Sequence, residues 1–128
     1  MFGWIKKKPP PPSGPDFSGI DSPAKVEVLF RRGDLEKLFL MPLELGGKDI
    51  AQNVVYVPVG LAAVKARIDN NIIGLLAAKG KITEYKATPV YQGKSFIPIA
   101  IKIAASNPGQ FTTTINIWGQ ALARGKEG

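Results

Sequence analysis

The chain has 128 residues, of which 45% are hydrophobic and 21% are charged, as expected for one globular domain. It contains no cysteine and no histidine, which excludes disulfides and thiolate nucleophiles and removes the usual zinc ligands and the commonest general base at neutral pH. The net charge is +7, but Lys6, Lys7 and Lys8 carry much of it, so the rest of the chain lacks the dense basic surface typical of nucleic-acid-binding proteins.

We expect three regions along the chain. Residues 1–20 are rich in proline and lysine and are predicted to be a disordered arm, residues 21–120 a single domain, and residues 121–128 a flexible tail. The sequence holds no apolar run long enough for a transmembrane segment, and its N-terminus lacks the pattern of a secretory signal. A reducing cytoplasm is the expected location, since it suits a chain without cysteine.

The arm contains four consecutive prolines, Pro9 to Pro12, which favour an extended polyproline II spacer. Two further interpretations remain open. Phe2, Trp4 and Ile5 beside the three lysines would suit a weak contact with an anionic membrane surface. The prolines would also suit binding in an aromatic groove.

The first predicted element is a short helix in "DSPAKVEVLFRRGD". Asp21 or Ser22 can cap its N-terminus, Pro23 suits the first helical position, and Gly33 can end it in the left-handed conformation. Apolar residues at helical spacing fill one face. A strand is the competing prediction, because the valines in this segment are β-branched.

Two strands are expected next. "LEKLFLM" predicts a strand near Lys37 to Met41 that is apolar on both faces and therefore central, and Pro42 would end it. "NVVYVP" predicts a second short strand rich in β-branched and aromatic residues. The loop between them, Glu44 to Asn53, contains Gly-Gly-Lys and is long for a strand connection, as is typical of loops that bind partners.

The clearest helix is predicted from Gly60 to Lys79, where the apolar period becomes helical and Gly80 follows in the capping position. Its predicted buried face contains Leu61, Val64, Ile68, Ile72, Leu75 and Leu76. The opposite, exposed face is predicted to carry Lys65, Arg67, Asp69 and Asn70. We expect close packing against a sheet to explain Gly74 inside this helix.

Three strands complete the predicted domain, in "KITEYKATP", "SFIPIAIKIA" and "FTTTINIW". The last two alternate along their length and are joined by "SNPG", which predicts an antiparallel hairpin. Because Pro98 cannot donate to a ladder, its strand is predicted at an edge or with a bulge, and an unprotected edge there would allow a homodimer. The alternation places Lys102 and Trp118 on the outer face.

These elements predict an α+β fold in the order α-β-β-α-β-β-β. It would contain a mostly antiparallel sheet of about five strands, with one long and one short helix on one face.

No pattern in the sequence indicates catalysis. The Gly-Gly-Lys of the loop lacks the spacing of a phosphate-binding loop and is followed by Asp49, so no nucleotide or other cofactor is expected. The carboxylates are scattered, and the nucleophile motif G-x-S-x-G is absent. We therefore predict no catalytic and no metal site, with a small enzyme using Asp or Glu as an alternative that stays open.

The stretches "MFGWIKKK", "GDLEKLFLMPLELGG", "NVVYVP" and "FTTTINIWG" make the chain look like small bacterial proteins of unassigned function. Proteins of this size and style include immunity proteins encoded beside secreted polymorphic toxins. The resemblance implies a bacterial, cytoplasmic protein that inhibits a toxin by binding it. It implies no site residues, because immunity proteins share no catalytic signature.

The leading hypothesis is thus a non-enzymatic protein-binding module that works by shape and charge complementarity, and the resemblance implies the immunity type. The alternative is a weak single-stranded nucleic-acid-binding protein, with lysines and aromatic rings on an outer sheet face. Together the two hypotheses single out the candidate partner-binding residues Glu44, Lys48, Asp49, Gln52, Lys86, Lys102 and Trp118.

Overall fold

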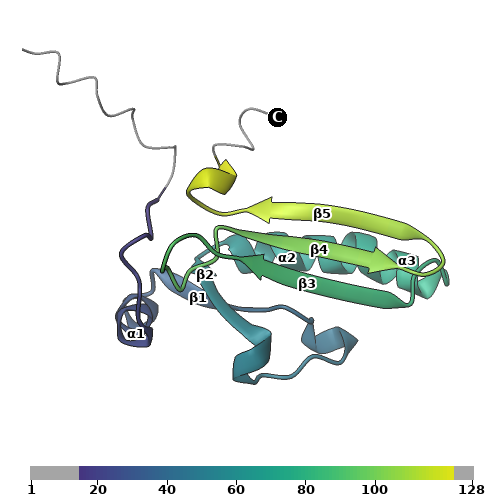
Figure 1. Cartoon of the computed structure of the whole chain (residues 1–128). Coiled ribbons are helices and arrows are strands. Elements are labelled where there is room, and N and C mark those ends of the chain that lie inside the picture. Colours follow the sequence, from purple (N-terminus) through teal and green to yellow (C-terminus); the bar gives the residue numbers. More distant parts are fainter. Residues whose placement is uncertain (1–14, 123–128) are drawn as a thin grey trace, which may run out of the picture.

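The computed structural model describes residues 15–122, which form an α+β fold with five strands, a long interrupted helix and shorter helices (Figure 1). Most of the predicted N-terminal arm and C-terminal tail lies outside the described residues. The main helices are α1 (Pro23–Arg31), α2 (Leu61–Ile68) and α3 (Gly74–Ala78). The strands are β1 (Leu35–Phe39), β2 (Val54–Pro58), β3 (Glu84–Val90), β4 (Ala100–Ser106) and β5 (Gln110–Asn116).

The strands form two antiparallel sheets where the sequence predicted one. β1 pairs with β2, from Leu35 opposite Pro58 to Phe39 opposite Val54. β3, β4 and β5 form a separate meander with β4 in the middle. The prediction that the Lys37 strand is central was therefore wrong, because β1 belongs to a two-stranded sheet and begins earlier, at Leu35.

The predicted position of Pro98 at a sheet edge was also wrong. Pro98 is buried and lies two residues before β4, which is paired on both sides. A homodimer therefore cannot form through the edge of this strand. The structure explains why proline is accepted here, since a residue outside the ladder has no ladder hydrogen bond to lose.

The long helix is interrupted by a π-helical segment, Asp69–Ile73, between α2 and α3. The N–H group of Gly74 donates to the carbonyl of Asp69, five residues earlier, and this wider turn rotates the following residues about the helix axis. As a result Ile73 is buried, whereas Ile72 and Leu75, predicted to be buried, are exposed. The same Asp69 carbonyl lies 3.3 Å from the position of a Cβ atom on Gly74, so the turn itself, and not a sheet, crowds this glycine.

The ends of the helices follow the sequence signals. The side chain of Ser22 accepts a hydrogen bond from the N–H of Lys25 and caps α1, and Gly33 and Gly80 adopt left-handed conformations just past their helices. α2 has no capping side chain of its own. A carboxylate oxygen of Glu36, on β1, accepts hydrogen bonds from the N–H groups of Gly60 and Ala62 at 2.8 and 3.0 Å instead.

The long helix covers one face of the three-stranded sheet, behind the strands in the view of Figure 1. The buried core between these layers includes Ile73, Ile101 and Ile103, and the core continues to Leu38 and Val57 of the two-stranded sheet. The opposite face of the three-stranded sheet is exposed. It carries Glu84, Lys86, Thr88, Lys102, Ala104, Thr112 and Thr114.

Both ends of the described chain lie against this core. Phe17 packs edge-to-face on Trp118, with 5.9 Å between ring centroids, and the hydroxyl of Ser95 donates to the carbonyl of Phe17 at 2.8 Å. Ala121 is buried as well. The packed region is therefore wider than the predicted residues 21–120. Within residues 15–122, no helix has the length and apolar character that crossing a membrane would need.

Candidate functional site

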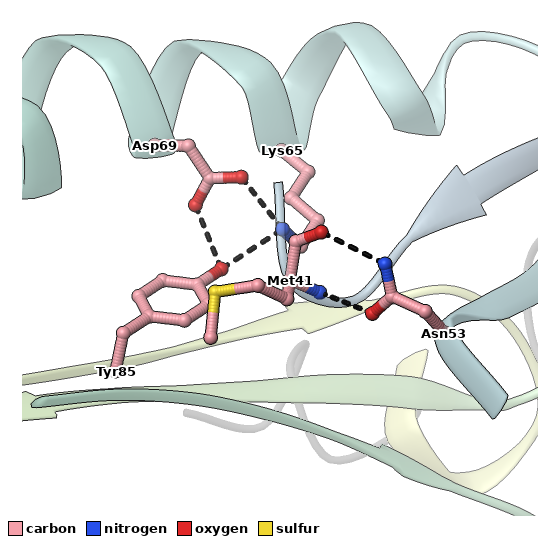
Figure 2. Close-up of polar contacts among 5 residues, drawn as sticks. All are labelled: Met41, Asn53, Lys65, Asp69 and Tyr85. Carbon is pink, nitrogen blue, oxygen red and sulfur yellow. Dashed lines mark hydrogen bonds and ion pairs between the residues drawn. The ribbon is translucent and has the colours of Figure 1, made fainter. Parts of the chain in front are cut away.

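One basic and one acidic side chain lie inside the protein, although both were predicted on an exposed helix face. Lys65 of α2 is 2% exposed, and Asp69, one helical turn later, is 7% exposed. Figure 2 shows both side chains pointing from the helix toward the ring of Tyr85 on β3. The prediction that Lys65 and Asp69 are exposed was thus wrong. Both side chains are buried because they belong to a polar cluster between the helix and the sheet.

The three side chains of this Lys65 cluster (Lys65, Asp69 and Tyr85) satisfy one another. The ammonium of Lys65 donates to Asp69 Oδ2 at 2.6 Å and to the Tyr85 hydroxyl at 2.8 Å. The Tyr85 hydroxyl donates in turn to Asp69 Oδ1 at 2.8 Å. Among the described residues no buried side-chain nitrogen or oxygen is left without a hydrogen-bond partner. A closed ring of this kind holds the helix on the sheet at one register.

Burial and charge shift the titration of the cluster. Burial lowers the pKa of Lys65, and the hydrogen bond and charge of Asp69 offset part of this effect. Burial, and then the hydrogen bond to Asp69, raise the pKa of Tyr85 well above the ordinary value for a phenol. At neutral pH the tyrosine is therefore a neutral donor to the carboxylate.

A small cavity of about 270 Å³ lies beside the cluster. Lys65 and Asp69 line its helical side, and Lys37 and Glu44 line the side formed by β1 and the following loop. Two carboxylates, those of Asp69 and Glu44, line the cavity, but both oxygens of Asp69 already accept hydrogen bonds, from Lys65 and from Tyr85. Residues 15–122 also contain no group of three side chains suited to a metal ion. The chemistry of the cluster is that of a structural ion pair.

The loop after β1 is fixed by the side chain of Asn53. Its carbonyl oxygen accepts from the Met41 N–H at 2.7 Å, and its amide donates to the Met41 carbonyl at 2.9 Å (Figure 2). The same amide also donates to the Lys48 carbonyl at 3.0 Å. Gly47 lies so close to Met41 that a Cβ atom there would collide with the Met41 carbonyl. The loop, which contains the short 3-10 turns Leu43–Leu45 and Ala51–Asn53, is therefore preorganised.

An aromatic groove runs beside this loop. Four rings line it, those of Phe30, Tyr56, Tyr91 and Phe96, together with apolar residues of α1 and β2, and it encloses about 440 Å³. Phe30 and Tyr56 meet edge-to-face at 5.2 Å between centroids. A second hollow of about 240 Å³, lined by Lys37, Asp49, Ile50, Ala51, Val54 and Tyr56, shares three of these residues with the groove. The two hollows are therefore neighbours.

The predicted partner-binding residues fall in three different places. Glu44, Lys48, Asp49 and Gln52 are exposed on the preorganised loop, as expected, and Asp49 pairs with Lys37 at 3.3 Å. Lys86 and Lys102 are exposed on neighbouring strands of the three-stranded sheet. Trp118 is 1% exposed and donates to the carbonyl of Ile97. It belongs to the core, so its predicted place on the outer face was wrong.

A local change in pairing explains the position of Trp118. The N–H groups of Ile117 and Trp118 both donate to the carbonyl of Ile99, at 2.7 and 3.2 Å, so two residues face one, as in a β-bulge. The alternation of β5 ends there, and both side chains turn inward. Within residues 15–122, no aromatic ring remains on the exposed face beside Lys86 and Lys102, because Tyr85 points to the helix side.

Neither the Lys65 cluster nor the aromatic groove was predicted from the sequence. The four rings come from segments far apart in the chain, and no spacing links them. The Lys65–Asp69 pair has the four-residue spacing of a helical ion pair, which in most helices is a surface feature. The chain matches no protein-family model, and comparisons with curated proteins and with solved structures give no match either.

Proposed function

We propose that this chain is a non-enzymatic protein-binding module. The observation that carries the proposal is the aromatic groove, in which Phe30, Tyr91 and Phe96 are 38%, 47% and 46% exposed. Aromatic residues are enriched in the buried centres of protein interfaces, and a contiguous exposed apolar surface is typical of a binding site. The rings line a depression, so a partner could bury an apolar side chain there.

The margin of the groove supports the same function. Glu27 lines the groove on its α1 side, where it pairs with Arg31. Lys37 and Asp49 line the neighbouring hollow, where they pair with each other. An apolar centre with a charged rim is the usual composition of a specific interface. The loop adds exposed apolar side chains, those of Leu43, Leu45 and Ile50. Its fixed backbone reduces the entropy lost on binding.

A bacterial immunity protein that neutralises a toxin is the specific form of this proposal. Such a protein requires a rigid surface and no chemistry of its own, and the side chains of the Lys65 cluster are engaged with one another. The partner would then be a toxin encoded beside this chain, with an apolar side chain that enters the groove.

The experiment is affinity capture with the full chain from lysate of the source organism. Phe96→Glu places a charge in the groove at an exposed position, and Leu75→Glu, at a 55% exposed position on α3, is the matched control. We expect one protein to be retained by the wild type and by the control but lost with Phe96→Glu. Equal retention by all three forms, or no retained protein, would contradict the proposal.

Single-stranded nucleic-acid binding is the second candidate, and it would use Lys86 and Lys102. We place it behind protein binding, because stacking platforms need exposed rings among the basic residues. Fluorescence anisotropy with a labelled oligonucleotide at low salt separates the two functions. Binding that is lost in Lys86→Ala with Lys102→Ala, and kept in Phe96→Glu, would favour the second candidate.

A further inference from the structure

We propose that two copies of this chain pair through the free edge of β5 and extend the three-stranded sheet across a two-fold axis. This inference goes beyond the proposed function and does not depend on it. The groove is lined by residues of α1, β2 and the segments around them, and none of its lining residues comes from β5. The two surfaces can therefore be tested separately.

The two edges of the three-stranded sheet differ in how well they are protected. β3 carries Glu84, Lys86 and Pro89, which are the residue types that block edge pairing. β5 has seven residues, Gln110–Asn116, without charge, proline or glycine. Among the described residues no strand pairs with its outer edge. An unprotected edge of this length presents N–H and C=O groups that another strand can pair with.

The pairing of β5 with β4 shows which backbone groups face outward. The N–H of Ile117 donates to the carbonyl of Ile99 directly opposite, so every second residue before Ile117 also exchanges hydrogen bonds with β4. The intervening residues Gln110, Thr112, Thr114 and Asn116 direct their backbone groups to the free edge. The same alternation places Pro89 at an outward position of β3, where its missing N–H interrupts that edge.

The sequence of β5 is symmetric about Thr113. In an antiparallel pair centred there, Gln110 would face Asn116, Phe111 would face Ile115, and Thr112 would face Thr114. Amide thus meets amide, apolar meets apolar, and hydroxyl meets hydroxyl. All four outward-facing residues meet outward-facing partners, so the hydrogen bonds and the side chains agree on one register. Centring the pair on Thr112 or Thr114 shortens the ladder and places apolar residues opposite threonine.

A two-fold axis of this kind is the commonest symmetry of homo-oligomers, and it requires a surface that is complementary to itself. β5 meets this requirement by sequence, by charge and by backbone direction. The long helices of both copies would lie on the same side of the extended sheet, and the exposed Thr-rich faces on the other. A second copy of the chain therefore fits this edge better than a strand of unrelated sequence.

A single cysteine at the centre of β5 tests the register. Facing residues that do not exchange hydrogen bonds have Cα atoms about 4.5 Å apart, which is within the range for a disulfide. Because the chain has no cysteine, Thr113→Cys adds the only thiol, and Thr88→Cys, on β3, is the matched control. Under oxidised glutathione we expect a covalent dimer with Thr113→Cys and none with the control. Equal cross-linking of the two variants would overturn the proposal.

A pair of charge variants tests the contact without covalent chemistry. Thr112 of one copy faces Thr114 of the other, so Thr112→Lys with Thr114→Lys should separate the copies, and Thr112→Lys with Thr114→Glu should restore the pair. Light scattering over about 1 μM to about 1 mM should show the mass of the wild type rising from 13.7 kDa toward twice that value. A wild type that stays monomeric, or a lysine pair that still dimerises, would refute the inference.

Discussion

Replacing Asp69 by asparagine removes the charge that compensates the buried ammonium of Lys65. The substitution keeps the size of the side chain, so the packing between α2 and β3 should survive. The carboxylate, however, accepts from both Lys65 and Tyr85, and an amide can satisfy only one of them. Lys65 is only 2% exposed, so solvent does little to stabilise its charge. The variant therefore isolates the cost of an unpaired charge in this interior.

The loss in unfolding free energy caused by Asp69→Asn has an upper limit, because Lys65 can lose its proton. Breaking a buried ion pair by removing one partner typically costs about 3 to 5 kcal/mol. Lys65 avoids carrying an unpaired charge if it loses its proton. Relative to the ordinary lysine pKa of 10.5, this deprotonation costs about 5 kcal/mol at pH 7 and about 2 kcal/mol at pH 9. The loss in unfolding free energy should consequently shrink as the pH rises, by up to about 1.4 kcal/mol per pH unit.

Urea unfolding of the wild type and Asp69→Asn at pH 7, 8 and 9 measures this difference. Lys65→Met with Asp69→Asn is the control, because it removes both charges and should recover most of the lost stability at pH 7. A loss that is the same at all three pH values would refute the reasoning, since it would show that the penalty does not come from the charge of Lys65.

Three further substitutions test neighbouring parts of the structure. Tyr85→Phe should lower the unfolding free energy by about 1 to 3 kcal/mol near pH 7. Because the pKa of Tyr85 is raised in the folded state, the stability that its hydroxyl contributes should fall as the pH rises above 10.0, and denaturant titrations should then show a smaller difference in unfolding free energy between wild type and variant. Asn53→Ala should cost about 1 to 3 kcal/mol by leaving the backbone groups of Met41 unpaired, and hydrogen exchange of the Met41 amide should accelerate; unchanged exchange would contradict the clamp. Gly47→Ala should lower the melting temperature through a backbone collision with Met41 worth about 1 to 3 kcal/mol, whereas a neutral result would show that the loop can shift.

Local signals in the sequence predicted the elements of this fold well. Ser22 and Gly33 mark the ends of α1, and the "SNPG" turn joins β4 to β5 in the expected hairpin. These features depend on neighbouring residues, so a single sequence contains the necessary information. The pairing of strands into two sheets depends on contacts between distant segments. The alternation of a strand shows which face is buried but not which strand lies beside it.

The candidate site was harder to predict, because it depends on departures from regular structure. A π-helical turn at Asp69–Ile73 moves the buried face of the long helix. Trp118 turns inward where its N–H and that of Ile117 both donate to the carbonyl of Ile99. Each insertion of one backbone unit shifts every later side chain, and residue type alone does not locate such insertions. The exposed loop residues Glu44, Lys48, Asp49 and Gln52 were placed correctly, since polar loops rarely fold inward.

The contact of Phe17 with Trp118 joins segments from opposite ends of the domain, and Ser95 ties the same region to the Phe17 carbonyl. A pulling force applied through both ends of the chain would act on this seam before it reached the helix-covered strands. The contacts of Phe17 with Trp118 and with Ser95 would break one after the other, and the antiparallel sheet of β3, β4 and β5 would stay intact. A force–extension trace should therefore record the release of residues 15–20 as a separate early step, and a single abrupt rupture would contradict this order.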